Sequence, residues 1–559
     1  MTNWNRPAGA IAGLLPSWRD YRQLPRTWRS DLLAGVTVGI VALPLALAFG
    51  VSSGAGAESG LVTAIIAGVV AAVFGGSNIQ VSGPTGAMVV VLGPIIAAQG
   101  VGVLAVVCLL AGVIVLVAGV LRLGRAVTYI PWPVIEGFTL GIAVIIFLQQ
   151  VPAALGAVPG PSSNSFLAAV EAAGAANWAT AWWSLLIVAV VAAVMVLAPR
   201  VHRALPGSII AIVIVTAGAT LLQLPVATIG VLPTTLPAPR LPETDWLTLV
   251  SLLGPAFTVA ALAAIESLLS ARVAVSISDT GPYDADRELI GQGLASVASG
   301  FFGGMPATGA IARTAVNIRA GGRTRMAAIV HALVLLLVVY AASNVVGSIP
   351  LAALSGVLMV TATRMISVAT VNTIIGSTRA DAIVFVITAL ITVSFDLIYA
   401  VGIGIAVAAF FALRALANSS GVHREELPGP VHDGDEHIAL YRLDGALFFG
   451  AADRVMNRVN AIENVTVVII RMSQLQILDA TGAQVITELV HSLERRGITV
   501  LIKGIQPRHL RLATRVGVVA SLRHQNHLFD ALDDAVAHAR SHITRAAHNP
   551  QAPNRQDHQ

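Results

Sequence analysis

Two short segments of the sequence combine glycine, proline and threonine in a way that could bind an anion. Residues 80–88 read QVSGPTGAM, and residues 303–311 read GGMPATGAI. Proline is tolerated in the first turn of a helix, and glycine lets the backbone approach a ligand closely. A helix that begins in such a segment presents free N–H groups and the positive end of its dipole, which together attract anions. The alternative is that glycine and proline only permit a kink or close helix packing.

We expect one anion site to be formed by both segments, with backbone amides as the main donors. The residues assigned to the site are Thr85, Gly86, Ala87, Thr308, Gly309, Ala310 and Arg313. Arg313 follows the second segment and offers a fixed fork of donors that matches a carboxylate or a sulfate. Its alternative role is to pair with Glu266 and neutralise a buried charge, and both roles can hold together.

Glu266 is the only acidic residue in the apolar stretch 257–269. A carboxylate at membrane depth is costly and is usually retained for function. Ser270 lies four residues further on, and therefore on the same face of a helix. We expect Glu266, with Ser270, to act as a proton-accepting coupling group or as a counter-charge to a nearby cation. The alternative places Glu266 near the membrane boundary, hydrated beside Arg272.

The composition predicts that these residues lie in a membrane protein. Of 559 residues, 56% are hydrophobic and only 11% are charged, whereas a soluble chain carries about a quarter charged residues. Arginines that flank membrane spans explain the net charge of +5, so no nucleic-acid partner is expected. The only cysteine, Cys108, lies in an apolar run, which excludes a disulfide framework and a thiol metal site. No cofactor and no metal are expected.

About fourteen membrane spans are predicted, several of them too short or too rich in glycine and proline to cross alone. They lie near residues 31–50, 60–75, 79–98, 101–121, 128–148, 181–198, 207–223, 249–270, 287–302, 306–318, 325–346, 350–366, 381–395 and 397–416. Arginine clusters before the first span and in later loops place both termini in the cytoplasm. We therefore expect a multi-pass protein of the inner (plasma) membrane.

The membrane part contains a repeated pattern. The sequence FGG at 74–76 is followed by TGAM at 85–88, and FGG at 302–304 is followed by TGAI at 308–311. Seven spans per half would place the second copy upside down relative to the first. Matching broken segments in inverted halves are the best sequence indication of a transporter's binding site. Coincidence in a chain rich in glycine and alanine is the alternative.

The sequence after the last span has ordinary soluble composition and predicts a small α/β domain. Strands are expected at 438–443, 446–449, 465–470 and 499–502, and helices at 451–460, 480–496, 506–516 and 529–540. The expected organisation is a cytoplasmic N-terminal segment (1–30), a membrane domain (31–417), a linker (418–436), the α/β domain (437–540) and a disordered tail (541–559).

The chain resembles the SulP (sulfate permease) family of anion transporters, which includes prestin. The resemblance rests on VTVGIVALP at 36–44, SGPTG at 82–86 and TGAIARTAVN at 308–317, and the C-terminal part resembles a STAS domain. It implies fourteen spans in two inverted sevens, a core domain that moves against a gate domain, and a homodimer in the lipid bilayer.

Different residues of the chain resemble two different branches of the family. AFGVSSGAGAE at 48–58 is similar to the bicarbonate branch, whose sodium site would correspond here to Glu266, Ser270 and residues 309–311. Ile311 provides no side-chain oxygen, and Arg313 places a cation where sodium would bind, which is electrostatically unfavourable. Residues 265–270 and 311–314 instead resemble the branch that carries C4-dicarboxylates with protons.

The sequence therefore predicts a secondary transporter of small anions, proton-coupled or exchanging, with bicarbonate or C4-dicarboxylate favoured over sulfate. The alternatives are a sodium-coupled bicarbonate symporter and a membrane-tethered anion sensor that signals through the STAS domain. For the sensor, Asp479 and Thr481 lie where related soluble domains carry a phosphorylated serine, and a cytoplasmic regulator would act there. No enzyme is expected, because the soluble part shows no nucleophile–base pair and no metal cluster.

Overall fold

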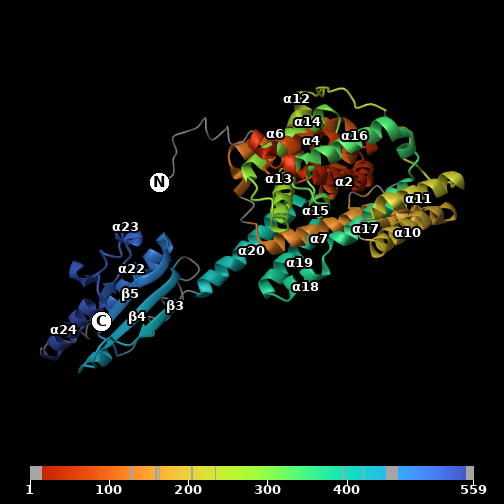
Figure 1. Ribbon diagram of the computed structural model, residues 1–559. Coiled ribbons are helices and arrows are strands. Elements are labelled where there is room, and N and C mark those ends of the chain that lie inside the picture. Colours follow the sequence, from red (N-terminus) through yellow and green to blue (C-terminus); the bar gives the residue numbers. More distant parts are fainter. Residues whose placement is uncertain are drawn as a thin grey trace. The chain divides into compact units, whose positions relative to one another are not determined.

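The computed structural model describes residues 16–125, 130–157, 162, 164–202, 205–232, 234–394, 397–419, 421–447 and 464–548 (Figure 1). The chain divides into two compact units, Met1–Ala406 and Val407–Gln559. The first unit is helical, and the second is built around a β-sheet.

The helices of the first unit follow the expected spans closely. They are α2 (Leu24–Ser52), α3 (Ala57–Val62), α4 (Gly68–Phe74), α5 (Gly86–Gln99), α6 (Leu104–Val120), α7 (Trp132–Gln149), α8 (Val151–Ala154), α9 (Ser165–Ala175), α10 (Trp178–Val201), α11 (Gly207–Leu221), α12 (Trp246–Ser251), α13 (Leu253–Ser276), α14 (Ala285–Phe301), α15 (Ile311–Arg319), α16 (Arg325–Gly347), α17 (Leu351–Met365), α18 (Val368–Ile375) and α19 (Arg379–Ser394). Helix α20 (Leu397–Ser419) continues the chain past Ala406.

Each expected span contains one of these helices, and the predicted fold class is confirmed. Among the described residues, eight helices are long and apolar enough to cross a membrane. The two segments that broke the hydrophobic pattern are interrupted in the structure as well. A two-residue strand precedes α5 and another precedes α15: β1 (Ser82–Gly83) and β2 (Thr308–Gly309).

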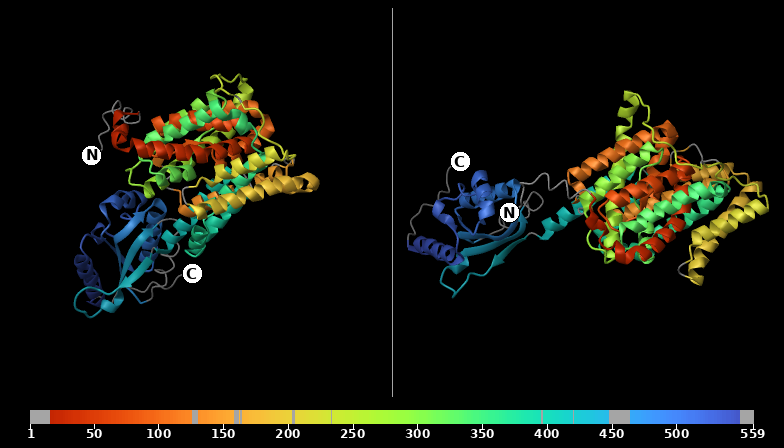
Figure 2. Two further views of the ribbon diagram at one scale, coloured as in Figure 1. Left: turned by 45° about the vertical axis from the view of Figure 1, so that its right-hand side comes forward. Right: turned by 45° about the horizontal axis from the view of Figure 1, so that its top comes forward.

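Small residues allow the helices around these breaks to pack closely. Helix α14 lies against α6, and α2 lies against α16 (Figures 1 and 2). A Cβ atom on Gly293 of α14 would lie 2.6 Å from the backbone nitrogen of Leu116 in α6. Gly293 therefore permits a backbone contact that a larger residue would prevent, as is common between membrane helices.

The second unit contains a five-stranded sheet in the order β3-β4-β5-β6-β7. Its strands are β3 (Gly421–Glu425), β4 (Ile438–Leu447), β5 (Val467–Leu478), β6 (Thr499–Lys503) and β7 (Leu528–Phe529), and its helices are α22 (Ala480–Arg495), α23 (Pro507–Val516) and α24 (Leu532–His548). Strand β3 is antiparallel to β4, and the remaining pairs are parallel.

Alternate residues of the strands form two separate apolar cores. Val468 and Ile470 of β5 belong to the core that contains α22. Val467 and Ile469 belong to the core that contains α24. Because neighbouring side chains of a strand point to opposite faces, α22 and α24 cover opposite faces of the sheet.

Three expectations for the second unit are corrected, and a fourth falls outside the described residues. The expected linker 418–436 contains β3, which pairs with β4 and belongs to the sheet. The boundary at residue 540 is too early, because α24 continues to His548; Ile543 packs against the same apolar core as Val536 and extends the helix's buried face. The strands expected at 438–443 and 446–449 are one strand, β4, as far as Leu447. The helix expected at 451–460 lies outside the described residues.

Candidate anion site

The two glycine-rich segments meet in the structure. Ser82 of β1 pairs with Gly309 of β2, and Gly83 pairs with Thr308, in an antiparallel arrangement. Just beyond the pair, the amide of Ala310 donates a hydrogen bond to the carbonyl of Val81 at 2.9 Å. Segments from the two halves of the membrane part therefore cross each other directly.

Both short helices begin at this crossing. Thr85 is the N-cap of α5, and Ala310 is the N-cap of α15. Neither N-cap side chain accepts a hydrogen bond from its own helix. Among the described residues no side-chain cap occupies the amides of these first turns, so they can donate to an anion, and both helix dipoles contribute positive potential at their N-termini.

Glu266 connects the N-terminus of α5 to strand β2, which precedes α15, through Thr85 and Thr308. The Oε2 atom of Glu266 accepts hydrogen bonds from Oγ1 of Thr85 at 2.8 Å and from Oγ1 of Thr308 at 2.9 Å. Glu266 belongs to α13 and is partly exposed. An ionised carboxylate only accepts hydrogen bonds, so this arrangement suits the charged form and occupies both threonine hydroxyls.

Gly309 has no room for a side chain. Its amide donates to Oγ of Ser267 at 3.1 Å, and Nε2 of Gln80 donates to the carbonyl of Ser267 at 3.3 Å. A Cβ atom on Gly309 would overlap the side-chain amide of Gln80. The close approach of β1, β2 and α13 therefore requires glycine at this position.

Arg313 is almost completely buried, with 2% of its surface exposed. One of its amino groups, Nη2, donates to the carbonyl of Pro84 at the start of α5. The other, Nη1, has no hydrogen-bond partner among the described residues and would lie 2.7 Å from a Cβ atom on Gly83. Within the described part of the chain no hydrogen bond or ion pair joins Arg313 to Glu266, so the direct pair considered from the sequence is not formed.

The remaining predicted residues have different surroundings. Ser270 lies one helical turn from Glu266 and is fully buried, and its hydroxyl has no partner among the described residues. Ala87 is buried in the first turn of α5. A Cβ atom on Gly86 would overlap Ile146 and would lie 3.4 Å from the ring of Phe49. An apolar wall therefore lies opposite the polar side of the crossing.

Sequence reasoning missed two polar residues beside the crossing. Nε2 of Gln292 donates to Oγ of Ser82 at 2.6 Å and to Oε1 of Glu288 at 2.9 Å. The other carboxylate oxygen of Glu288 accepts from the amides of Gly76 and Ser77. Glu288 and Gln292 are four residues apart in a predicted span and therefore share one helix face, and this spacing could have identified them.

The predicted residues of the second unit lie at the start of α22. Asp479 is the N-cap, and its carboxylate accepts a hydrogen bond from the amide of Gly482 at 2.7 Å. Thr481 lies in the first turn and is exposed. Asp479 thus has a structural role as a cap, and the Thr481 hydroxyl is accessible.

Comparisons with known proteins agree with this architecture. Residues 28–388 match the model of the sulfate permease family, and residues 430–535 match that of the STAS domain. The chain therefore belongs to the sulfate permease family and is a multi-pass membrane protein of the anion-transporter class.

Relatives align along most of the chain. A putative sulfate transporter of Bacillus subtilis, YvdB, is 33% identical, with 91% of this chain and 97% of the relative covered. The bicarbonate transporter BicA of Synechocystis is 30% identical, with 91% and 95% covered. The structure of SLC26A9 has the same fold, with a TM-score of 0.81 at 17% identity over 97% of this chain and 95% of the other.

Proposed function

We propose that this protein is a proton-coupled symporter of a divalent oxyanion, with sulfate as the first candidate. The observation that supports it best is the crossing of β1 and β2, which brings two helix N-termini and the carboxylate of Glu266 together. The anion would bind to the free amides at the starts of α5 and α15. A rocking motion of this core against the rest of the membrane domain would expose the site to either side.

The charge at the crossing fits a divalent anion when Glu266 is neutral. Each helix N-terminus is equivalent to roughly half a positive charge, so α5 and α15 together supply about one. Arg313, buried behind Pro84, adds one permanent positive charge. The sum is about +2 with Glu266 protonated, and about +1 with Glu266 ionised.

Proton coupling follows from the same arrangement. An ionised Glu266 repels an arriving anion. Its carboxylate also accepts the hydrogen bonds of the Thr85 and Thr308 hydroxyls, which then cannot donate to the anion. Protonation removes the repulsion and frees a hydroxyl to donate to the anion. Anion binding and proton binding therefore favour each other, as linkage requires.

The coupling ion also restricts the substrate. Symport of one proton with one bicarbonate is equivalent to moving carbon dioxide and water, which gains little because carbon dioxide crosses a bilayer unaided. Sulfate and C4-dicarboxylates have no such route. Glu266 as a proton site therefore favours a divalent anion and changes the order expected from the sequence, in which bicarbonate ranked above sulfate.

Sodium-coupled bicarbonate transport is the second candidate, and one observation favours it. A carboxylate oxygen and two hydroxyl oxygens, from Glu266, Thr85 and Thr308, lie within 3.2 Å of one another, and hard cations prefer oxygen ligands. The nearby guanidinium of Arg313 opposes a cation at this place.

Uptake into proteoliposomes tests the proposal. Radiolabelled sulfate, succinate and bicarbonate are each supplied with an inward proton gradient, an inward sodium gradient or neither. We expect sulfate or succinate uptake that the proton gradient increases, that a protonophore abolishes and that sodium leaves unchanged. Bicarbonate uptake that requires sodium and ignores the proton gradient would contradict the proposal.

The assembly and orientation are also proposed. We infer a homodimer in the plasma membrane with both termini in the cytoplasm, which rests on the placement of arginines and on the family resemblance. Because Cys108 is the only cysteine and is buried, single cysteines introduced at either end can be labelled from one side of the membrane. Labelling of both ends from the cytoplasmic side only is the expected result.

A further inference from the structure

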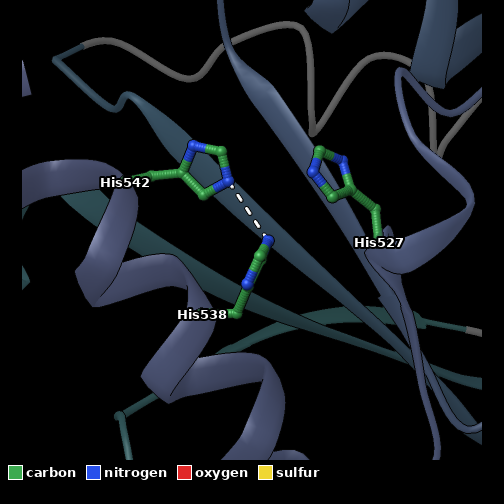
Figure 3. A group of neighbouring side chains, drawn as sticks. All are labelled: His527, His538 and His542. Atoms are coloured by element: carbon green, nitrogen blue, oxygen red, sulfur yellow. Dashed lines mark hydrogen bonds between the residues drawn. The ribbon is translucent and has the colours of Figure 1, made fainter. Parts of the chain in front are cut away.

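Three histidines of the second unit lie close together, although no metal cluster was expected there from the sequence. His527 ends the 3-10 turn η6 (Gln525–His527), which precedes β7, and His538 and His542 lie one turn apart on α24. Figure 3 shows the rings of His538 and His542 directed at each other, with His527 beside them. One ring nitrogen from each residue can be chosen so that all three lie within 4.8 Å of one another.

The spacing of the two helical histidines matches that of ligands on one metal ion. Their Nε2 atoms are 3.3 Å apart. Two nitrogens at the usual zinc distance of 2.0–2.1 Å in tetrahedral geometry are separated by about 3.3 Å. A hydrogen bond between neutral imidazoles, the alternative, accounts for this pair and leaves the approach of His527 unexplained.

His527 is buried and incompletely satisfied. Only 1% of its surface is exposed, and its Nδ1 atom has no hydrogen-bond partner among the described residues. Burial and the neighbouring His542 and His538 lower the pKa of His527 to about 4. The ring is therefore neutral near pH 7, and neutral imidazole is the form that binds a metal.

The surrounding charges permit a cation at this place. Burial, His538 and the positive charges of Arg545 and Arg523 lower the pKa of His542 from its ordinary value, which keeps its ring neutral and able to bind a metal. Arg523 lies nearby, and its guanidinium is paired with the carboxylate of Glu494 at 3.0 Å. The pair reduces the positive potential that a metal ion would meet.

We propose that His527, His538 and His542 bind one divalent transition-metal ion, with Zn²⁺ as the best match to three imidazoles. Imidazole ligands suit zinc, and three protein ligands leave one coordination position for water. The ion would join the turn before β7 to α24, so that it stabilises the C-terminal helix on the sheet. The site is independent of the anion site and of the proposed transport function.

Metal binding by the full-length protein tests the proposal. The protein is purified in detergent without a polyhistidine tag, treated with a chelator, dialysed and titrated with Zn²⁺ or Co²⁺. We expect one ion per chain, and visible absorption bands of four-coordinate Co²⁺. His538→Gln and His542→Gln should each weaken binding by at least about tenfold, whereas His491→Gln, at an exposed position on α22, should bind like the wild type.

Two results would overturn the proposal. One is the lack of saturable binding at one ion per chain by the wild type. The other is equal affinity of the wild type and a monodisperse His542→Gln variant. If both variants aggregate, hydrogen exchange of the wild type with and without Zn²⁺ tests the site. Zn²⁺ should slow hydrogen exchange in α24 and around β7. Unchanged exchange in both segments would contradict the site.

Discussion

The hydroxyl oxygens of Thr85 and Thr308 lie 3.2 Å apart, although 223 positions separate the two residues in the sequence. Thr85 is the N-cap of α5, Thr308 lies in β2 just before α15, and each donates to Glu266. This relationship makes the anion site and the coupling carboxylate a single hydrogen-bonded unit. Changes to either threonine should therefore affect both binding and coupling.

Replacing Thr85 or Thr308 by valine tests that unit. Valine keeps the shape and removes the hydroxyl that donates to Glu266. Hydrogen bonds to charged groups contribute about 1.5–3 kcal/mol, and each 1.4 kcal/mol corresponds to a factor of ten. We expect initial uptake rates about 10- to 100-fold below the wild type, measured in proteoliposomes with matched protein content.

Thr361→Val is the matched control. Among the described residues, the Thr361 hydroxyl donates only to the carbonyl of Val357 within α17, so uptake should stay within about twofold of the wild type. Equal losses in all three variants would indicate that threonine content, and not the crossing, determines the rate.

A side chain at Gly309 should prevent transport, because it would displace Gln80 from Ser267. We expect Gly309→Val and Gly309→Ala to lose uptake while remaining monodisperse in size-exclusion chromatography. Adding Gln80→Ala to Gly309→Ala creates space and should restore part of the activity. Gly218→Ala is the control, because its new methyl group meets no atom within 4 Å, and it should transport like the wild type. A Gly309→Val protein that transports normally would place the site elsewhere.

The STAS domain should tune or assemble the transporter without contributing to the substrate path. The residues of the anion site all belong to the first unit. Truncation after Asn418 is therefore expected to preserve the ratio of sulfate to succinate uptake, even if expression or rate falls. A changed ratio would show that the second unit takes part in substrate selection.

The attachment of α24 should weaken in acid. Both guanidinium contacts of Arg540 to the Asp435 carboxylate are 2.8 Å long, and they lower the pKa of Asp435 from its ordinary value. As the pH falls below about 4, the unfolded chain therefore binds more protons than the folded chain. The ion pair between Arg540 and Asp435 stabilises the folded state above that pH, and this stabilisation is lost as the pH falls through the lower pKa that Asp435 has in the folded protein.

Hydrogen exchange of α24, corrected for the intrinsic rate at each pH, measures this effect. We expect Asp435→Asn to accelerate exchange at pH 7, with the difference from the wild type disappearing in acid. Asp433→Asn, at an exposed position, serves as the control. A difference that stays constant down to pH 3 would show that the ion pair does not hold the helix.

The sequence predicted the elements of the membrane domain because their signals are local. Long apolar runs identify the helices, and the glycine and proline of residues 80–88 and 303–311 indicate where two of them break. The meeting of the two breaks could be anticipated from the repeat. Their hydrogen bonds could not, because the shared acceptor Glu266 comes from α13 and depends on how three elements pack.

Other details depended on contacts that no local pattern encodes. Arg313 was expected beside the substrate or paired with Glu266; among the described residues it forms no hydrogen bond or ion pair with Glu266 and donates to the carbonyl of Pro84. The helix α24 continues past residue 540 because Ile543 finds an apolar surface on the sheet. His527 joins His538 and His542 only because the turn before β7 folds back against α24.

Whether Glu266 couples protons to the anion can be measured by comparing wild-type protein with Glu266→Gln in two modes of sulfate transport. Glutamine keeps the size of the side chain and cannot take up a proton. We expect that Glu266→Gln still exchanges internal for external sulfate but no longer accumulates sulfate when a pH gradient is imposed. Unimpaired accumulation by Glu266→Gln under the pH gradient would contradict the role of Glu266 as the proton-coupling group.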